Sequence, residues 1–374
     1  MDFSLTDEQR LFQQELDKSL ESIGPLKRVR AHAEHPCEFA SDIWQSLCAL
    51  GISGILVPEE FGGMGLGILD AVLIAETLGK HAVPSPFLGP TVLAPLALKL
   101  AGSKQQQADL LPRIADGTLR IAVGMSEGVV GARSDAGVEC RNDRLFGRAL
   151  FVVDHVGAQQ CMIADKHGRL YLLESSAPGL EIIALDTIDR TRTAAVLILD
   201  GVEAEPLARS SGQTLQRIAH ACHVILAADL LGAATKMLDQ AVEYAKFREQ
   251  FGRPIGTFQA VKHMCAEMAA ELEPGRALLW YAGYAFDSNL SDAALCCLHA
   301  KSYLAEAARF VARTAIEVHG GIGITDELGL HFWFKRIGWS YQAFGSPTRL
   351  REDAAAIQNL MSAPTDNLIA ELAS

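Results

Sequence analysis

Residues 244–263 read YAKFREQFGRPIGTFQAVKH and carry the strongest signal in the chain. A long apolar helix is expected to run to about Phe251, where Gly252 and Pro254 break it, because glycine suits a helix C-cap and proline cannot continue a helix. We expect Thr257 to cap the next helix. One interpretation is a helical hairpin with an arginine at a negative helix end. The other is a diphosphate clamp, in which the guanidinium and the new helix start donate hydrogen bonds.

A second motif, HGGIGIT, occupies residues 319–325 and follows an alanine-rich helical stretch. Its adjacent glycines, Gly320 and Gly321, would let a backbone approach a ligand closely. Taken alone, the motif more often marks a helix that ends in a glycine turn. His319 alone is more often a packing or capping residue than a catalyst.

Outside these motifs the chain divides into three parts: residues 1–118, 119–207 and 208–374. The first and last show helical periodicity, and the middle part shows short β-like runs, so we expect a mainly helical α+β fold with a central antiparallel β domain. Strands are expected at 119–125, 137–140, 144–153, 161–164, 170–174, 180–185 and 194–199, and C-terminal helices at 215–251, from 257, at 291–318, at 326–343 and in a short tail.

Composition narrows the class of protein. The 374 residues are 49% hydrophobic and 21% charged with a net charge of −12, which describes a globular chain of two or three domains and argues against non-specific nucleic-acid binding. Eight cysteines without a CxxC pair argue against a structural zinc site and a disulfide scaffold, so no metal is expected. The N-terminus has no signal-peptide pattern, and no apolar run reaches roughly 18 residues, so we expect a cytoplasmic protein without a membrane span.

Taken together, the motifs resemble the acyl-CoA dehydrogenase family over essentially the whole length. The matching segments are PEEFGG at 58–63, GMSE at 124–127, REQFGRPIGTFQAVKH at 248–263 and HGGIGIT at 319–325. The REQFG…PIG…FQ pattern is the specific marker, whereas the other three would be weak alone. The resemblance implies an N-terminal helical domain, a central β domain and a C-terminal four-helix bundle. It further implies FAD at the domain junction and a dimer or tetramer, since in the family the adenine end of the flavin reaches a neighbouring subunit.

Site residues follow from the resemblance position by position. Arg248 would meet the flavin diphosphate of the neighbouring subunit, with Phe251 and Gln259 beside it. Gly320 and Gly321 would line the same ADP portion.

The resemblance also places three residues beside the flavin ring. Met125 and Ser126 match the pair whose backbone and hydroxyl touch the isoalloxazine. Phe151 falls where the family usually has a tryptophan against the ring.

The family reaction forms an α,β double bond in an acyl-CoA thioester. A carboxylate removes the α proton, hydride leaves to the flavin, and an electron-transfer flavoprotein takes the electrons. Hydrogen bonds to the thioester oxygen must acidify the α C–H, and burial must raise the pKa of the base.

The chain departs from the family where the base belongs. The usual glutamate precedes a glycine in a C-terminal loop, and here Phe344 stands before Gly345. In some members the glutamate lies on the long helix, where this chain has Cys222. Asp229, seven residues further along that helix among apolar neighbours, is the nearest substitute, and a raised pKa would suit it to the role. A buried structural aspartate is the alternative for the same residue.

Other family positions also differ. Val153 replaces a threonine near the flavin, Glu317 replaces a glutamine, and Pro347 with Thr348 alters the segment that returns to the flavin. Small residues in the long helix, such as Ala227 and Gly232, would allow either a wide substrate cleft or close helix packing.

Some family members are two-gene heteromers that act on bulky acyl-CoA substrates such as steroid side chains, and one chain type lacks the base. The Phe344–Gly345 pair resembles that type, so we expect a base-lacking subunit that works with itself or a paralogous chain in fatty-acid or steroid side-chain catabolism. The alternatives are a silent scaffold that binds acyl-CoA or flavin, and a flavin monooxygenase on the same fold.

Overall fold

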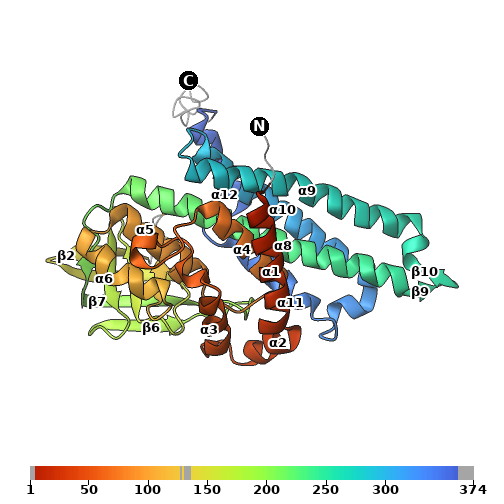
Figure 1. The fold of residues 1–374 in the computed structure, drawn as a ribbon, viewed down its shortest axis with the longest axis horizontal. Coiled ribbons are helices and arrows are strands. Elements are labelled where there is room, and N and C mark those ends of the chain that lie inside the picture. Colours follow the sequence, from red (N-terminus) through yellow and green to blue (C-terminus); the bar gives the residue numbers. More distant parts are fainter. Residues whose placement is uncertain (1–4, 127–128, 130–135, 361–374) are drawn as a thin grey trace, which may run out of the picture.

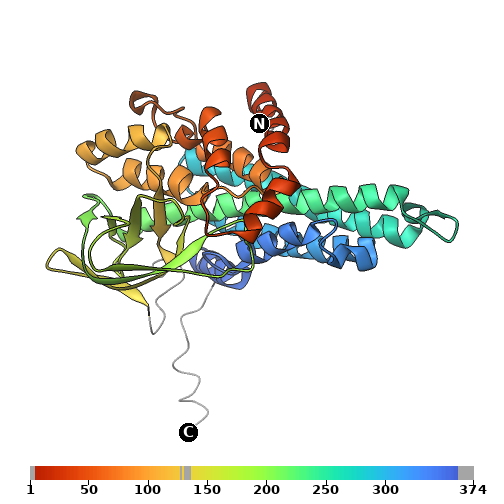
Figure 2. The same ribbon diagram turned by 90° about the horizontal axis from the view of Figure 1, so that it is seen from below.

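The computed structural model describes residues 5–126, 129 and 136–360. A long helix, α8, runs from beside the sheet to the far end of a helical bundle, and the N-terminal helices pack against its first half (Figures 1 and 2). The expected mainly helical fold with a central sheet is confirmed. The buried core is continuous through all three parts, because one cluster of apolar side chains includes Leu20 from the first part, Met162 from the sheet and Leu304 from the bundle.

Helices make up the N-terminal part. Thr6 caps the first helix, since its hydroxyl accepts from the Gln9 amide in a capping box. The helices are α1 (Asp7–Ile23), α2 (Leu26–Glu34), α3 (Ser41–Ala49), α4 (Ile68–Lys80), α5 (Ala94–Ala101) and α6 (Lys104–Ala115), with a π-helical turn at Leu88–Leu93.

The central sheet has the strand order β6-β7-β3-β1-β4-β5-β8, with β2 paired to β3. The expected antiparallel pairing holds in the described sheet except between β1 and β4, which pair in parallel with Ile121 against Gln160. The strands are β1 (Ile121–Gly124), β2 (Gly137–Arg141), β3 (Arg144–Val153), β4 (Gln160–Ala164), β5 (Leu170–Glu174), β6 (Leu180–Ala184), β7 (Ala194–Glu203) and β8 (Glu205–Pro206).

The C-terminal part is a bundle of α8 (Gly212–Phe247), α9 (Gln259–Asp287), α10 (Ala293–His319) and α11 (Leu330–Gln342), followed by α12 (Pro347–Ile357). α8 ends four residues before the expected end, because Arg248 turns extended and leads into a two-strand hairpin, β9 (Glu249–Gln250) with β10 (Arg253–Pro254). Thr257 does not cap α9; its hydroxyl donates to the carbonyl of Pro254 instead.

Small residues in α8 serve close helix packing. A Cβ on Gly232 would lie 1.8 Å from the carbonyl oxygen of Glu76, and a Cβ on Gly79 would lie 2.4 Å from that of Asp229. The backbones of α4 and α8 therefore touch, and at these positions close packing, not a wide cleft, explains the glycines.

One helix in the described part of the chain, α8, is long and apolar enough on average to cross a membrane. Its sequence nevertheless contains no continuous apolar run of that length, because His223 and Asp229 interrupt the run. The apolar window is 89% buried inside the protein, which is the property of a core helix.

Candidate functional site

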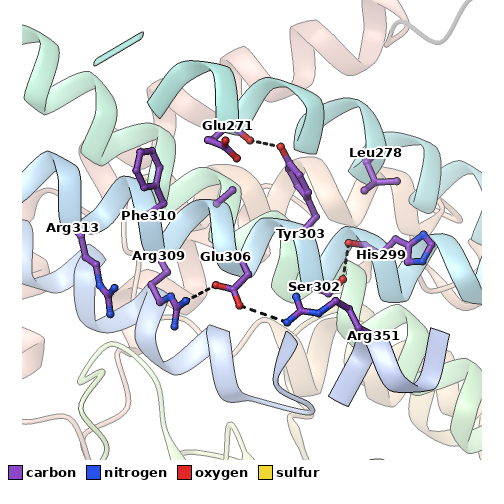
Figure 3. A pocket seen from close by; sticks show the side chains of 11 residues that line it. Glu271, Leu278, His299, Ser302, Tyr303, Glu306, Arg309, Phe310, Arg313 and Arg351 are labelled. Atoms are coloured by element: carbon purple, nitrogen blue, oxygen red, sulfur yellow. Dashed lines mark hydrogen bonds and ion pairs between the residues drawn. The ribbon is translucent and has the colours of Figure 1, made fainter. Parts of the chain in front are cut away.

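Two large cavities open on the described surface. The first, of about 830 Å³, lies on the outer face of the bundle between α9, α10 and α12 (Figure 3). Glu306 pairs with Arg309 at 2.6 Å and with Arg351 at 3.9 Å (Figure 3). This carboxylate therefore holds two of the three arginines that line the cavity. None of the residues singled out from the sequence lines this cavity.

The second cavity, of about 710 Å³ and here called the cleft, lies between the sheet and the helices α11 and α12. Its volume falls in the usual range for small-molecule sites. The sequence candidates Ser126 and Phe151 line it, together with the loop at Phe344. The full lining is Ser126, Phe151, Leu185, Asp186, Thr187, Ile188, Gly338, Trp339, Gln342, Ala343, Phe344, Gly345, Ser346 and Arg349.

A bulge in β3 turns Phe151 into the cleft. The register between β3 and β7 shifts between Ala149 and Val152, and Phe151 has a φ of 55°, in the left-handed region that costs a non-glycine residue energy. Its ring lies 6.4 Å from that of Trp339 across the cleft lining. The energetic cost of this backbone conformation indicates that Phe151 serves the wall of the cleft and not the regular pairing of the strand.

Trp339 joins the cleft wall to buried charge. The Arg192 guanidinium lies 4.7 Å from the centre of the indole ring, a cation–π distance, and the indole Nε1 has no hydrogen-bond partner in the described structure. A positive charge therefore lies directly behind one wall of the cleft.

The residue that replaces the family glutamate, Phe344, stands at the cleft in a strained turn. Its φ is 54° and that of Gly345 is 120°. Asp186 is the one carboxylate among the described lining residues; its side chain is 86% exposed and 3.9 Å from Arg190. A solvated carboxylate lacks the burial that would make it a strong base.

Asp229 forms an ion cluster instead of facing the cleft. Its oxygens lie 2.6 Å from Arg192 and 2.8 Å from Arg336, and Ser340 donates at 3.1 Å. Burial alone would raise the pKa of Asp229, but the two guanidinium groups outweigh it and lower the pKa. The expected raised pKa was wrong. The role of Asp229 as a base stays a prediction that no contact with the cleft supports.

Cys222, at the other family position for the base, is fully buried on α8. Burial raises the pKa of its thiol far above the ordinary value, so the sulfur stays protonated and cannot accept a proton. The two positions that the resemblance implies for the base thus hold a phenylalanine and a protonated thiol.

The diphosphate-clamp candidates gather at the opposite end of the bundle, here called the tip. Arg248 caps α8, and Phe251 beside it is 92% exposed with a φ of 53°. Gln259 is the first residue of α9, whose free N–H groups point outward. A Cβ on Gly320 or Gly321 would meet nothing within 4 Å, so both backbones are open to a ligand.

A ring stack brings the two tip motifs together. Tyr244 on α8 lies 4.7 Å from His319 at the end of α10, in a stacked geometry. Glu317, one turn before the glycines, is exposed at the same end. Its charge opposes that of Arg248, which moderates the positive potential of the tip.

Cleft and tip cannot serve one dinucleotide within one chain. His223 contacts the cleft loop, and Arg248 lies 25 residues further along α8, which at about 1.5 Å per residue is about 37 Å. Figure 1 shows the hairpin β9–β10 at the far end of the bundle from the sheet. The two groups of candidate residues are therefore too far apart for one dinucleotide to contact both within a single chain.

Two expected positions lie away from open space. Met125 is fully buried and does not line the cleft. Val153 is also buried, with Val123 and Ala194 as its strand neighbours. Glu127, the last residue of the GMSE segment, lies outside the described residues.

Sequence reasoning missed Trp339, His223 and Lys301. Lys301 carried a usable signal, because it sits between Cys297 and Ala305 on the apolar stripe of α10, where a lysine is out of place. Trp339 carried no such sequence signal, since a tryptophan on a helix most often packs in the hydrophobic core.

In the described residues no three His, Cys, Asp or Glu side chains converge to hold a metal ion. The cleft and tip do fit a flavin nucleotide. Aromatic walls and the free indole donor suit a ring system, whereas the exposed Arg248, open glycine backbones and a helix N-terminus suit a diphosphate.

Comparison with known proteins agrees with this geometry. Residues 6–118 match the model of the acyl-CoA dehydrogenase N-terminal domain, and residues 215–356 match that of the C-terminal domain. The acyl-CoA dehydrogenase IpdE2 of Mycobacterium tuberculosis is 34% identical over 85% of this chain and 87% of its own.

Two solved structures share the fold over nearly the whole length. The Tcur3481-Tcur3483 steroid ACAD superposes with a TM-score of 0.86 at 30% identity, covering 95% of this chain and 99% of its own. The ChsE4-ChsE5 complex of Mycobacterium tuberculosis gives 0.88 at 25% identity, over 97% and 100%. On these grounds the chain belongs to the acyl-CoA dehydrogenase family, whose fold binds FAD and whose members are oxidoreductases acting on acyl-CoA.

Proposed function

We propose that this chain is the base-lacking subunit of an FAD-dependent acyl-CoA dehydrogenase and that a second chain supplies the catalytic carboxylate. The observation that carries the proposal is Phe344, which occupies the strained turn at the cleft where the family glutamate belongs. Asp186, the carboxylate among the described cleft-lining residues, is solvated, and Asp229 is held in ion pairs away from the cleft.

The cleft would hold the flavin ring and the tip of another chain would hold its diphosphate. Phe151 and Trp339 would pack against the ring, and Ser126 would donate or accept at its edge. Arg248, Phe251, Gln259, Gly320 and Gly321 of the neighbouring chain would bind the ADP portion. Bound FAD supplies the hydride acceptor, and this chain's residues orient the ring and exclude water.

The decisive experiment is purification of the chain alone and together with a paralogous chain encoded beside it, with visible absorption spectra and native mass of both preparations. We expect bound flavin in the two-chain assembly and bleaching of its absorption when acyl-CoA is added without oxygen. Efficient bleaching by the single chain would refute the lack of a base. Flavin in neither preparation would favour the alternative, a silent scaffold that binds acyl-CoA.

The remaining assignments belong to the same proposal. The two solved heteromeric or steroid-directed neighbours favour a bulky acyl-CoA substrate, such as a steroid side chain, over a short fatty acyl group. Electrons would pass to an electron-transfer flavoprotein, and the protein would act in the cytoplasm. A flavin monooxygenase on the same fold would instead consume oxygen together with electrons from NAD(P)H. An oxygen electrode would detect that consumption of oxygen.

A further inference from the structure

The loop that closes the cleft is under backbone strain. α11 ends at Gln342, Phe344 and Gly345 both have positive φ, and α12 begins at Pro347 behind the cap Ser346. A non-glycine residue in this region costs on the order of 1 kcal/mol or more, so the surroundings must hold it. Local backbone bonds contribute little, since the amide of Gly345 reaches the Gln342 carbonyl only at 3.3 Å.

His223 of α8 holds the loop at its strained residue. Its Nε2 lies 2.8 Å from the carbonyl oxygen of Phe344, and because a carbonyl only accepts, Nε2 carries the hydrogen. Burial lowers the pKa of His223 to about 3, so the ring is a neutral donor throughout the physiological range. The side chain is 3% exposed, and its Nδ1 has no partner in the described structure.

Lys301 of α10 holds the same segment from a second helix. Its Nζ donates to the carbonyls of Ser340 at 2.6 Å and Tyr341 at 3.4 Å, which belong to the last turn of α11 and have no helical partner of their own. The side chain is fully buried, and burial lowers the pKa of Lys301 to about 7; the amine donates hydrogen bonds in either protonation state. Lysine is rarely buried without a specific task.

The two donors act from the two most central helices of the bundle and meet on one short segment. Neither His223 nor Lys301 lines the cleft, whereas the segment that they hold does. Through these hydrogen bonds, the buried helices α8 and α10 fix the position of the segment that lines the cleft.

We propose that His223 and Lys301 are positioning residues that hold residues 340–345 in the conformation that shapes the cleft for its ligand. This inference rests on the proposed function only in naming that ligand as a flavin. In chains of this fold that carry a carboxylate at position 344, the same two donors would aim it.

The test uses His223, because Lys301→Met removes a donor deep in the core and can prevent folding. His223→Leu removes the donor, and His223→Gln keeps an N–H at nearly the same reach. Hydrogen exchange is followed by mass spectrometry on peptides from residues 340–349 and, as an internal reference, from α9. Flavin affinity is measured by fluorescence titration of the same proteins.

We expect His223→Leu to speed exchange of the 340–349 peptides about tenfold and to weaken flavin binding about tenfold, with α9 unchanged, since one such bond contributes about 1.4 kcal/mol. His223→Gln should restore both. Unchanged loop exchange in the leucine variant, or equal defects in both variants, would overturn the inference. If no protein binds flavin, the proposed function fails while the exchange measurement still decides the positioning role.

Discussion

A phenylalanine in the left-handed backbone region limits what the cleft can do chemically. Phe344 has no proton acceptor, yet its backbone already adopts the strained turn. Since phenylalanine and glutamate have comparable steric cost at positive φ, exchanging them should add little backbone strain. The cleft therefore lacks the catalytic carboxylate, whereas the backbone turn that would carry it is already in place.

Phe344→Glu should therefore create dehydrogenase activity in the single chain. The new carboxyl would lie beside Ala343 and Trp339, where partial burial raises the pKa of a carboxyl and makes it a better base. We expect bleaching of the flavin by acyl-CoA to appear in stopped-flow measurements. Phe344→Gln, of matched size without a base, is the control, and activity in both variants would contradict this explanation.

A second residue-scale prediction concerns Asp154, which is buried and accepts from the Gly89 amide at 2.7 Å. Burial raises the pKa of Asp154 to about 6, although the Gly89 bond and the charges of Arg192 and Arg336 oppose the shift. For a raised pKa, the stabilising contribution is complete below the unfolded value near 3.8 and is lost as pH rises through about 6.

Asp154→Asn cannot ionise, so it should escape that loss. Relative to this variant, the wild type should lose up to about 3 kcal/mol of unfolding free energy between about pH 4 and pH 7. Urea denaturation at a series of pH values measures the difference. Parallel pH profiles for the two proteins would show that Asp154 does not titrate in this range.

At the scale of elements, the contact between α4 and α8 depends on glycine. Gly232→Ala would place a methyl group 1.8 Å from the Glu76 carbonyl oxygen, so the helices must separate. We expect a loss of about 1–3 kcal/mol in unfolding free energy, measured by chemical denaturation. Gly212→Ala on the same helix meets nothing within 4 Å and should be nearly neutral; equal losses would rule out backbone contact as the cause.

Most elements could be predicted from the sequence because their signals are local. Alternation and turn residues located β3 and β5 with their observed bounds, and helical periodicity located α10 within two residues at each end. Pairing is not local, so the parallel contact of β1 with β4 could not be read from either strand. The true end of α8 was missed because hairpin pairing of Glu249 with Pro254 competes with helix continuation.

The candidate site was predictable only where a motif carried it. Arg248 and Gly320 lie at the tip as a group, and Ser126 with Phe151 lines the cleft. Trp339 and His223 escaped prediction because their roles come from tertiary contacts with Arg192 and Phe344. Asp229 was misjudged for the same reason, since its two arginine partners are 37 and 107 residues away in sequence.

On the scale of the whole molecule, the separation of tip and cleft makes flavin binding a property of an assembly. Arg248→Ala should weaken flavin binding at least about tenfold by fluorescence titration, because a charged bidentate donor is lost. Lys246→Ala is the control, since that cation is already paired with Glu243 at 2.5 Å.

Co-expression of two variants of this chain tests whether the cleft of one chain and the tip of another form a single flavin site. Gly338→Trp would fill the cleft, where a Cβ has open space, and Arg248→Ala would disable the tip. Co-expressed, the two variants should bind flavin that neither binds alone, because a mixed pair keeps one intact site. No recovery would mean that cleft and tip of a single chain act together.

Arg336 has one further consequence. Its guanidinium reaches the Val83 carbonyl of the N-terminal part, the Thr191 hydroxyl of the sheet part and Asp229 of the bundle, so a single buried side chain ties all three. Calorimetry of the purified protein should accordingly register one endotherm and not three, and Asp229→Asn, which leaves two guanidinium groups uncompensated, should move that whole endotherm to lower temperature without splitting it.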